Sequence, residues 1–515
     1  MLLEHIKFCL GVILKKLVSS FGVAVLSFSG VGLFAGSASW NSEGGGDWGK
    51  EDNWLQTAGV NTIFPNGKED VATFPAFSRM NPAIITLNGT YDIGTLRFDS
   101  DNKYTLSSGT LNVYKSISTN GELDISSNLV LENSVEIIAN GNCVITGNIS
   151  GKCGLIKQGA ADLTLSGKNS YEGSTQIQSG LFQAGGEAVF SPISAVEIAN
   201  TTGVVFSLNN YNNQIGSLSG GGRLGGNILL GSATLTVGND SDTQYEGEIF
   251  GKGGLVKVGA GSLTLCGLNT YSGSTEIQEG VLQAGCEGAF PQKSTLILAN
   301  RIGASFDLGG YNQTIPMVKG GGVLGGNINL GRATLTIGDK KDMTFSGSIT
   351  GCGGIVKQGS GILTLERMNT YTGPTLVKEG VLNITGMVHS NVTVTEKSVL
   401  QGSGLIVGDL INFGALKAGS GAGSLTITGN QIQKSGSLLE IKLDGAKPDK
   451  LIILGALTIE ENVELNISLP PSAPPGTLFE IVSAGGGIHG TFIKINPPKQ
   501  CIVTMTAHTI VIEKK

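Results

Sequence analysis

Short runs in which apolar and polar residues alternate recur along the chain after residue 38, and glycine or asparagine separates them. One such run is Leu163-Thr164-Leu165, and another is Thr175-Gln176-Ile177-Gln178, which ends before Gly180. Alternation with a period of two is typical of a half-buried β-strand. The segment between them, Asn169 to Gly173, contains residue types that tolerate the positive φ angles of turns. No stretch keeps a 3.6-residue period with helix caps, so the sequence predicts strands and turns and essentially no helix.

A unit of 100 residues repeats in the middle of the chain. Residues 151–182 match residues 251–282 and 351–382 in one register, and residues 220–228 match residues 320–328. The matched positions include a glycine, a lysine, an asparagine and a tyrosine, namely Gly154, Gly254 and Gly354, Lys157, Lys257 and Lys357, Asn169, Asn269 and Asn369, and Tyr171, Tyr271 and Tyr371. Internal repetition of short strands is the signature of a solenoid.

The repeats favour a parallel β-helix, because the strands are short and no crossover helices separate them. A single turn cannot bury its apolar side chains alone, whereas stacked turns share one interior and pair their backbones. Turns of roughly 20–25 residues would give about 20 turns and a rod on the order of 100 Å long. We expect the N-terminal cap and first turns in residues 39–146, the repeat region in 147–385 and a C-terminal segment in 386–515.

The first 38 residues have the pattern of an export signal. Three lysines lie around a short apolar patch before an uncharged, mostly apolar stretch from Leu17 to Phe34, and the small residues Ala35-Gly36-Ser37-Ala38-Ser39 follow it. This order is typical of a secretory signal peptide, and we expect cleavage at Ala38. The alternative is a retained membrane anchor, since residues 17–38 are long enough to span a bilayer.

The composition narrows the class of protein further. Glycine makes up 80 of 515 residues, but there is no collagen-like period, and the 40% hydrophobic share suits a packed core. The net charge is −6 and no basic cluster appears, which argues against a nucleic-acid partner. The seven cysteines form no C-x-x-C pair, so a zinc or thioredoxin-type site has no support. Buried single thiols are favoured over one or two disulfides.

The repeat itself resembles a known family. All three copies fit K-x-G-x-x-x-L-T-L-x-x-x-N-x-Y-x-G-x-T, which is similar to the autotransporter-associated β-strand repeat, also called the passenger-associated transport repeat. Trp48, Trp54, Pro65, Asp70 and Phe74 resemble the opening segment of such chains, and residues 414–493 resemble the end of a passenger. The resemblance implies a right-handed parallel β-helix and export as the passenger of a type V secretion protein.

The resemblance also implies a translocator β-barrel after the passenger, whereas this sequence ends at Lys515 without one. Three alternatives stay open at this point. The chain is truncated, it uses a separate outer-membrane translocator, or it stays in the periplasm.

Few residues in the sequence suggest catalysis. Residues 39–388 contain no histidine, and only His389, His489 and His508 follow the signal, without a G-x-S-x-G motif. The remaining candidates are carboxylates, as in β-helix lyases and glycosidases; they are Asp99 and Asp101, Asp240 and Asp242, and Asp339 and Asp342. The last two groups recur at matched places in successive repeats, which favours solvated turns over an active site. A calcium loop at Asp240-Ser241-Asp242 lacks the glycine and glutamate of an EF-hand.

Aromatic residues suggest two binding hypotheses beside structural ones. The three tryptophans lie within residues 40–54 and are interpreted as a plug over the first turn, with a platform for sugar rings as the alternative. Asn169 and Tyr171 with their repeat mates are interpreted as a turn with a packed tyrosine, with a ligand ladder as the alternative.

The sequence as a whole predicts an exported, non-enzymatic passenger with an adhesive or stalk role at the surface of a Gram-negative envelope. A β-helix enzyme acting on polysaccharide and a passive envelope-layer protein are the alternatives. No catalytic residue, metal site or cofactor is predicted. The expected partners are a ligand of the envelope or of a host surface and a separate outer-membrane translocator, with no nucleic acid.

Overall fold

The computed structural model describes residues 36–515 apart from 59–63, 78–81, 420–422, 444–448 and 470–473. Residues 1–35, most of the predicted export signal, lie outside the described residues. Within the described part the chain is all-β, and its only helical segment is a 3-10 turn at Glu51–Asn53. None of the helices found among these residues is long and apolar enough to cross a membrane.

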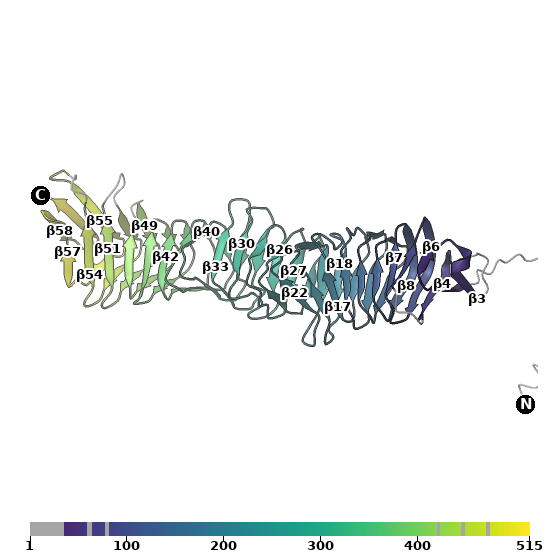
Figure 1. Ribbon diagram of the computed structural model, residues 1–515. Helices are drawn as coiled ribbons and strands as arrows, with labels where there is room; N and C mark the ends of the chain where they lie inside the picture. Colours follow the sequence, from purple (N-terminus) through teal and green to yellow (C-terminus); the bar gives the residue numbers. More distant parts are fainter. Residues whose placement is uncertain (1–35, 59–63, 78–81, 420–422, 444–448, 470–473) are drawn as a thin grey trace, which may run out of the picture.

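The strands form a parallel β-solenoid, which confirms the predicted fold class (Figure 1). One turn consists of β38 (Ile355–Lys357), β39 (Ile362–Leu365) and β40 (Met368–Asn369). The next turn repeats this order with β41 (Thr375–Val377), β42 (Gly380–Ile384) and β43 (Met387–Val388), each parallel to the strand one turn before. The solenoid therefore has three faces, and one turn takes about 20 residues.

The core follows from the alternation along each strand. In β15 (Leu163–Leu165) the two leucines are fully buried and Thr164 faces outward. Leu163 pairs with Cys143 one turn earlier and with Phe182 one turn later, so inward side chains stack along the axis. Each fully buried aliphatic side chain stabilises the fold by about 1.5–3 kcal/mol. The stability of the rod therefore accumulates turn by turn through contacts between neighbouring turns.

Successive 100-residue repeats do not lie above one another on the same face. The strand β14 (Leu155–Gln158) belongs to one sheet with β27 (Ser262–Leu265), five turns later. The strands between them in that sheet are β16 (Thr175–Ile177), β18 (Ala195–Ile198), β21 (Ser217–Gly220) and β24 (Thr243–Tyr245). However, the repeat equivalent of β14 is β26 (Leu255–Lys257), which precedes β27 by one face and pairs with β28 (Thr275–Ile277). One repeat therefore spans four and two-thirds turns.

The third repeat shows the same offset. Five turns join β26 to β39, through β28, β30 (Thr295–Leu298), β33 (Met317–Gly320) and β36 (Met343–Phe345). The equivalent of β26 is β38, which again comes one face before the end of the fifth turn. The three copies of the repeat are thus rotated by about a third of a turn from one to the next.

The N-terminal end of the rod is closed by the three tryptophans. β1 (Ser37–Trp40) pairs antiparallel with β3 (Trp54–Ala58) and parallel with β4 (Gly67–Pro75). Trp40, Trp48 and Trp54 are at most 5% exposed, and Trp54 packs edge to face against each of the other two rings. The plug interpretation is confirmed, and the alternative of a sugar-stacking platform is wrong because the rings are inside the protein.

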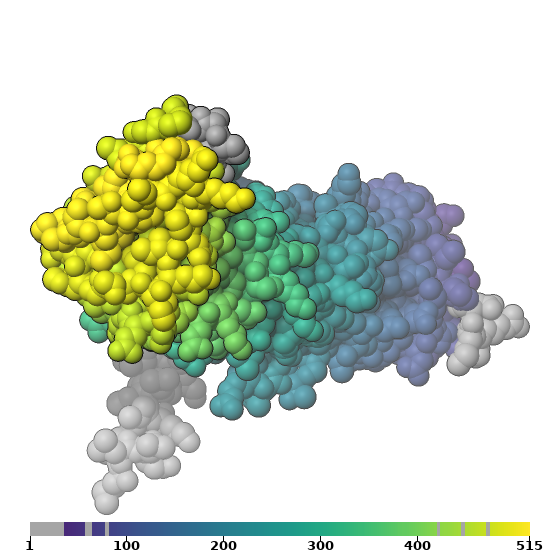
Figure 2. Space-filling view, turned by 90° about the vertical axis from the view of Figure 1, so that its left-hand side faces the viewer, coloured from purple at the N-terminus to yellow at the C-terminus, as the bar shows by residue number. Residues whose placement is uncertain are grey.

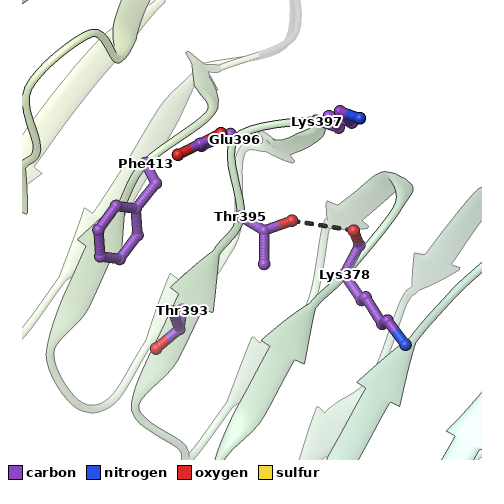
Figure 3. A pocket seen from close by; sticks show the side chains of 6 residues that line it. All are labelled: Lys378, Thr393, Thr395, Glu396, Lys397 and Phe413. Atoms are coloured by element: carbon purple, nitrogen blue, oxygen red, sulfur yellow. Dashed lines mark hydrogen bonds between the residues drawn. The ribbon is translucent and has the colours of Figure 1, made fainter.

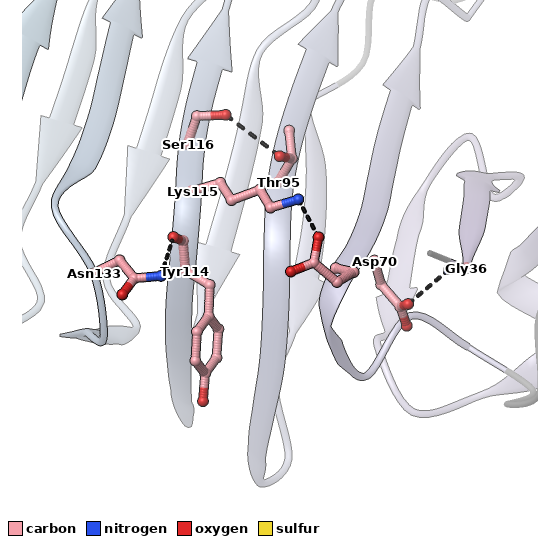
Figure 4. A network of polar contacts seen from close by, with 8 residues as sticks. Gly36, Asp70, Thr95, Tyr114, Lys115, Ser116 and Asn133 are labelled. Atoms are coloured by element: carbon pink, nitrogen blue, oxygen red, sulfur yellow. Dashed lines mark hydrogen bonds and ion pairs between the residues drawn. The ribbon is translucent and has the colours of Figure 1, made fainter. Parts of the chain in front are cut away.

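Polar contacts hold this cap to the first turns (Figure 4). The Asp70 carboxylate accepts hydrogen bonds from the backbone N–H groups of Gly36 and Asn66, at 2.8 and 3.0 Å. On the outer surface beside it, Lys115 of β8 (Thr110–Thr119) forms an ion pair with Glu69. The cap is therefore part of the solenoid and not a separate unit.

At the C-terminal end of the rod, which Figure 2 shows in yellow, an antiparallel hairpin continues one sheet of the solenoid. β55 (Leu478–Ala484) pairs antiparallel with β59 (Thr509–Lys514), which also pairs with β58 (Cys501–Met505). This hairpin ends the run of parallel strands in its sheet, because the last two pairings change direction. The two ends of the described rod are thus built from antiparallel strands, and the turns between them are parallel.

Candidate functional site

The signature lysine of each repeat lies inside the solenoid. The Lys157 ammonium donates to the carbonyl oxygens of Gln158, Gly159 and Ser179 at 2.7–2.9 Å, which joins two successive turns. Lys257 and Lys357 make the same contacts in their repeats. Loss of hydration lowers the pKa of each of the three lysines to about 8. These lysines hold the stack together and offer nothing to a ligand.

The signature asparagine fills a gap between strands. Asn169 accepts a hydrogen bond from the backbone N–H of Ile149 at 2.7 Å and donates to the carbonyl of Val189 at 2.6 Å. Asn269 makes the equivalent pair of bonds with Ile249 and Ala289. The side chain thus replaces the backbone ladder where the turn between strands interrupts it. This explains why the motif requires an amide, which can both donate and accept.

The signature tyrosine belongs to the same interior. The Tyr171 hydroxyl bonds to the Thr175 hydroxyl at 2.7 Å, which bonds to the Ser194 hydroxyl at 2.9 Å. Burial raises the pKa of Tyr171 to about 12, and the ring is 1% exposed. The prediction of a packed tyrosine is confirmed. The alternative of a ligand ladder is wrong, because the side chains are buried and the repeats face different sides of the rod.

The candidate carboxylates are exposed and bind backbone groups of the next turn. Asp242 accepts hydrogen bonds from the backbone N–H and the hydroxyl of Ser262, both at 2.8 Å, and these bonds lower the pKa of Asp242. Asp342 accepts from the backbone N–H of Ile362 at 2.8 Å. The two aspartates precede β24 and β36, which belong to different faces, so they do not share one groove.

The remaining candidates are placed apart from one another. Asp99 lies 3.9 Å from Arg97 in an exposed ion pair. Asp101, Asp240 and Asp339 are exposed at turns. Among the residues that the structure describes, no three His, Cys, Asp or Glu side chains gather as a metal-binding group.

The cysteines are free thiols wherever the structure describes them. Cys143 is buried, as predicted, and burial raises the pKa of its thiol to about 12. The prediction of burial is wrong for the others, because Cys352 is exposed and Cys153, Cys266, Cys286 and Cys501 are partly exposed.

The residue predicted to precede the cleavage point lies in an ordered strand. Ala38 is 1% exposed in β1 and pairs with Ala72 of β4. Cleavage after it would leave Ser39 and Trp40 to begin the first strand.

A groove at one corner of the rod is the best candidate for a ligand site (Figure 3). It measures about 440 Å³ and lies where three neighbouring strands of one sheet end: β41, β44 (Val392–Val394) and β47 (Leu410–Asn412). The groove is lined by Lys378, Thr393, Thr395, Glu396, Lys397 and Phe413. The Thr395 hydroxyl donates to the backbone carbonyl of Lys378 at 2.9 Å, which fixes the floor between them.

The groove combines an exposed aromatic ring with several charges. Phe413 is 38% exposed, and the Lys434 ammonium lies 6.0 Å from its ring centre. Lys434 also bonds to Glu460 at 2.6 Å, which lowers the pKa of that carboxyl. None of the ion pairs found among the described residues includes Lys378 or Lys397. The site can therefore offer both an apolar surface and free ammonium groups.

Sequence reasoning missed this groove. A single phenylalanine in a turn and two lysines separated by 19 residues form no motif. One signal was present, because Lys378 stands where the other two repeats have Gln178 and Gln278. A departure from the repeat on an outward position marks a place where the third copy differs in function or surroundings.

Comparison with known proteins agrees with this architecture. The passenger-associated-transport-repeat family matches residues 155–184, 255–284 and 355–384. An adhesin autotransporter of Brucella suis is 36% identical over 253 residues, which is 46% of this chain and 7% of that protein. An extracellular serine protease of Serratia marcescens is 30% identical over 164 residues, 30% of this chain and 16% of that protein.

An uncharacterized lipoprotein of Escherichia coli is 25% identical over 285 residues, 47% of this chain and 21% of that protein. The chain therefore spans only a small part of the length of the curated relatives it matches. The chain is thus an exported, passenger-type β-solenoid of the kind found in autotransporters, and it carries three passenger-associated-transport repeats.

Proposed function

We propose that this solenoid acts at the cell surface or in the extracellular space as a non-enzymatic adhesive stalk. The observation that carries the proposal is that the side chains most capable of chemistry form structural hydrogen bonds. The lysine, asparagine and tyrosine of each repeat serve the stack, and the exposed aspartates cap turns. A rod of this kind separates its two ends, so a surface near one end lies far from the other. The match to an adhesin autotransporter supports the same role.

The proposal includes processing and transport. The export signal is removed after Ala38, so that the mature chain starts at Ser39, and an outer-membrane translocator carries the chain to the surface. The divisions at residues 146 and 385 separate the cap, the repeat region and the C-terminal segment. N-terminal sequencing of the exported chain tests the cleavage point, and a mature chain that begins elsewhere would contradict it.

Expression in a Gram-negative host that does not adhere tests the function. We expect surface exposure, detected by protease shaving or antibody labelling of intact cells, and a gain of adhesion to host cells or extracellular matrix. Purified chain should not cleave polysaccharides, peptides or esters. Turnover that is lost on mutating Asp240 or Asp342 would instead favour the polysaccharide-acting enzyme. Surface display without adhesion would favour a passive envelope layer.

A further inference from the structure

We propose that the groove at Phe413 binds an acidic sugar residue of a glycan. The inference deepens the adhesive role proposed above and rests on it. The groove is local to the end of the third repeat, because the equivalents of Lys378 in the first two copies are glutamines. A binding site need occur once, whereas features that support the stack recur in every copy.

The floor of the groove suits the flat face of a sugar ring. Phe413 follows β47 and exposes its ring to solvent, with Thr393 and Thr395 on the neighbouring turn beside it (Figure 3). Sugar rings carry C–H groups on one face and hydroxyl groups around the edge, so they pack on aromatic rings and bond to polar groups at the same time. The half-buried hydroxyl of Thr393 can meet a sugar hydroxyl while the ring meets the apolar face.

The charges around this floor favour an anion. Lys378 and Lys397 are exposed on two successive turns of the same corner, and Glu396 is the one carboxylate that lines the groove. Lys434 and Glu460, on the two turns after that of Phe413, neutralise each other in their ion pair. The rim therefore carries one net positive charge, in a chain whose net charge is −6. A carboxylate or sulfate on the sugar would supply the ion pair that Lys378 and Lys397 do not form with any described residue.

Binding of defined oligosaccharides to the purified chain tests the proposal. The probes are a hexasaccharide that contains uronic acid, a sulfated hexasaccharide without carboxylates, and a neutral hexasaccharide of equal length, each measured by titration calorimetry. We expect an acidic probe to bind more tightly than the neutral one, with an affinity that falls as salt rises. The two acidic probes decide whether the anion is a carboxylate or a sulfate.

The variants are chosen to keep the fold. Lys378→Gln introduces the residue of the other two repeats, and together with Lys397→Gln it should weaken acidic-glycan binding by about 5- to 10-fold. Phe413→Ala should weaken it by roughly 10-fold. The control is Tyr114→Ala, which removes another aromatic ring with a lysine above it, at 5.2 Å from Lys68, and should leave binding unchanged. Thermal unfolding checks that every variant remains folded.

The outcomes separate this proposal from the function on which it rests. Equal binding of acidic and neutral probes, no binding of any probe, or full binding by the Lys378→Gln/Lys397→Gln variant would overturn the glycan site. Cells that adhere although the purified chain binds no acidic glycan would leave the adhesive role standing without this site. Cells that fail to adhere although the purified chain binds acidic glycan would overturn the adhesive role instead.

Discussion

A polar side chain inside the solenoid stabilises the fold only if its polar atoms have hydrogen-bond partners. Lys257 and Asn269 are almost fully buried, yet each places its polar atoms on backbone groups of two turns. Gln431, the first residue of β50 (Gln431–Gln433), is also fully buried, but neither its amide nitrogen nor its amide oxygen has a hydrogen-bond partner. A buried amide without partners costs free energy, so the same residue type can either support or weaken the stack.

Replacing Gln431 with leucine should stabilise the chain. The change removes an unpaired amide and adds apolar surface among Leu410 and Leu457, the neighbours of Gln431 in the sheet. We expect the free energy of unfolding to rise by about 1–2 kcal/mol, measured by urea titration. The matched control is Gln433→Leu. Its amide oxygen accepts from Asn412 and Ser437 at 2.7 and 2.8 Å, so this variant should lose stability. A loss for Gln431→Leu as well would contradict the argument.

The three buried lysines should make stability rise with pH in a mildly alkaline window. In the folded chain their pKa is about 8, against 10.5 when they are exposed by unfolding. Between about pH 8 and 10 the unfolded chain therefore binds more protons than the folded chain, and the free energy of unfolding increases with pH. The buried tyrosines act in the opposite sense only above about pH 10, where unfolded tyrosines lose their protons.

Urea titrations at pH 7.5 and 9.5 check this expectation. The control is the variant Lys157→Met/Lys257→Met/Lys357→Met at the same two pH values. The free energy of unfolding of the natural chain minus that of this variant should be larger at pH 9.5 than at pH 7.5. A difference between the two proteins that does not change with pH would show that the lysines keep their ordinary pKa.

The distance between successive turns of the solenoid differs from one glycine position to another. Successive turns approach so closely at some corners that only glycine fits. A Cβ atom on Gly253 would lie 1.7 Å from the carbonyl oxygen of Ala233, one turn earlier. Gly44, in the N-terminal cap, has no atom within 4 Å of such a Cβ. The glycine content thus includes positions fixed by backbone contact and positions that tolerate a side chain.

Gly253→Ala should therefore destabilise the chain while Gly44→Ala does not. The first change forces two backbones apart, and we expect a loss of about 1–3 kcal/mol in the free energy of unfolding. The second should stay within about 0.5 kcal/mol. Thermal or urea unfolding of the two variants provides the measurement, and equal effects would contradict the close approach at Gly253.

The sequence predicted the elements better than their arrangement around the axis. Alternation in runs such as Leu163–Leu165 and the register of the repeats were enough for strands, turns and a stacked fold. The rotation of one repeat relative to the next depends on the number of strands in a repeat. The 100-residue period alone does not give this number. The groove at Phe413 depends on side chains brought together from three turns, which no local pattern records.

The whole molecule is a one-dimensional stack, so its stability can differ from one end to the other. The C-terminal part has dense buried aliphatic residues, such as Leu439, Ile441, Leu451, Ile453 and Leu465. The unpaired amide of Gln431 and the unpaired amide nitrogen of Gln433 lie in the same part and reduce this stability.

Limited proteolysis in mild denaturant tests where the rod is most stable. We expect the region from about residue 390 onward to fold first and to resist longest, leaving a fragment that ends near Lys515. Mass spectrometry identifies the fragment. An N-terminal fragment that survives after the last hundred residues are digested would refute the expectation.

Because successive repeats are rotated about the axis of the rod, the number of repeats determines the direction in which the C-terminal part faces. Residues 250 and 351 could be joined without disturbing the stack, because residue 351 holds the same place in its repeat as residue 251. Such a shortened chain would keep its core, yet everything beyond the junction would point about 120° away from its former direction relative to the tryptophan cap. Only the gain or loss of three units would restore the original aim. A gain or loss of one repeat during evolution would therefore turn the surface of the C-terminal part to a different side of the rod.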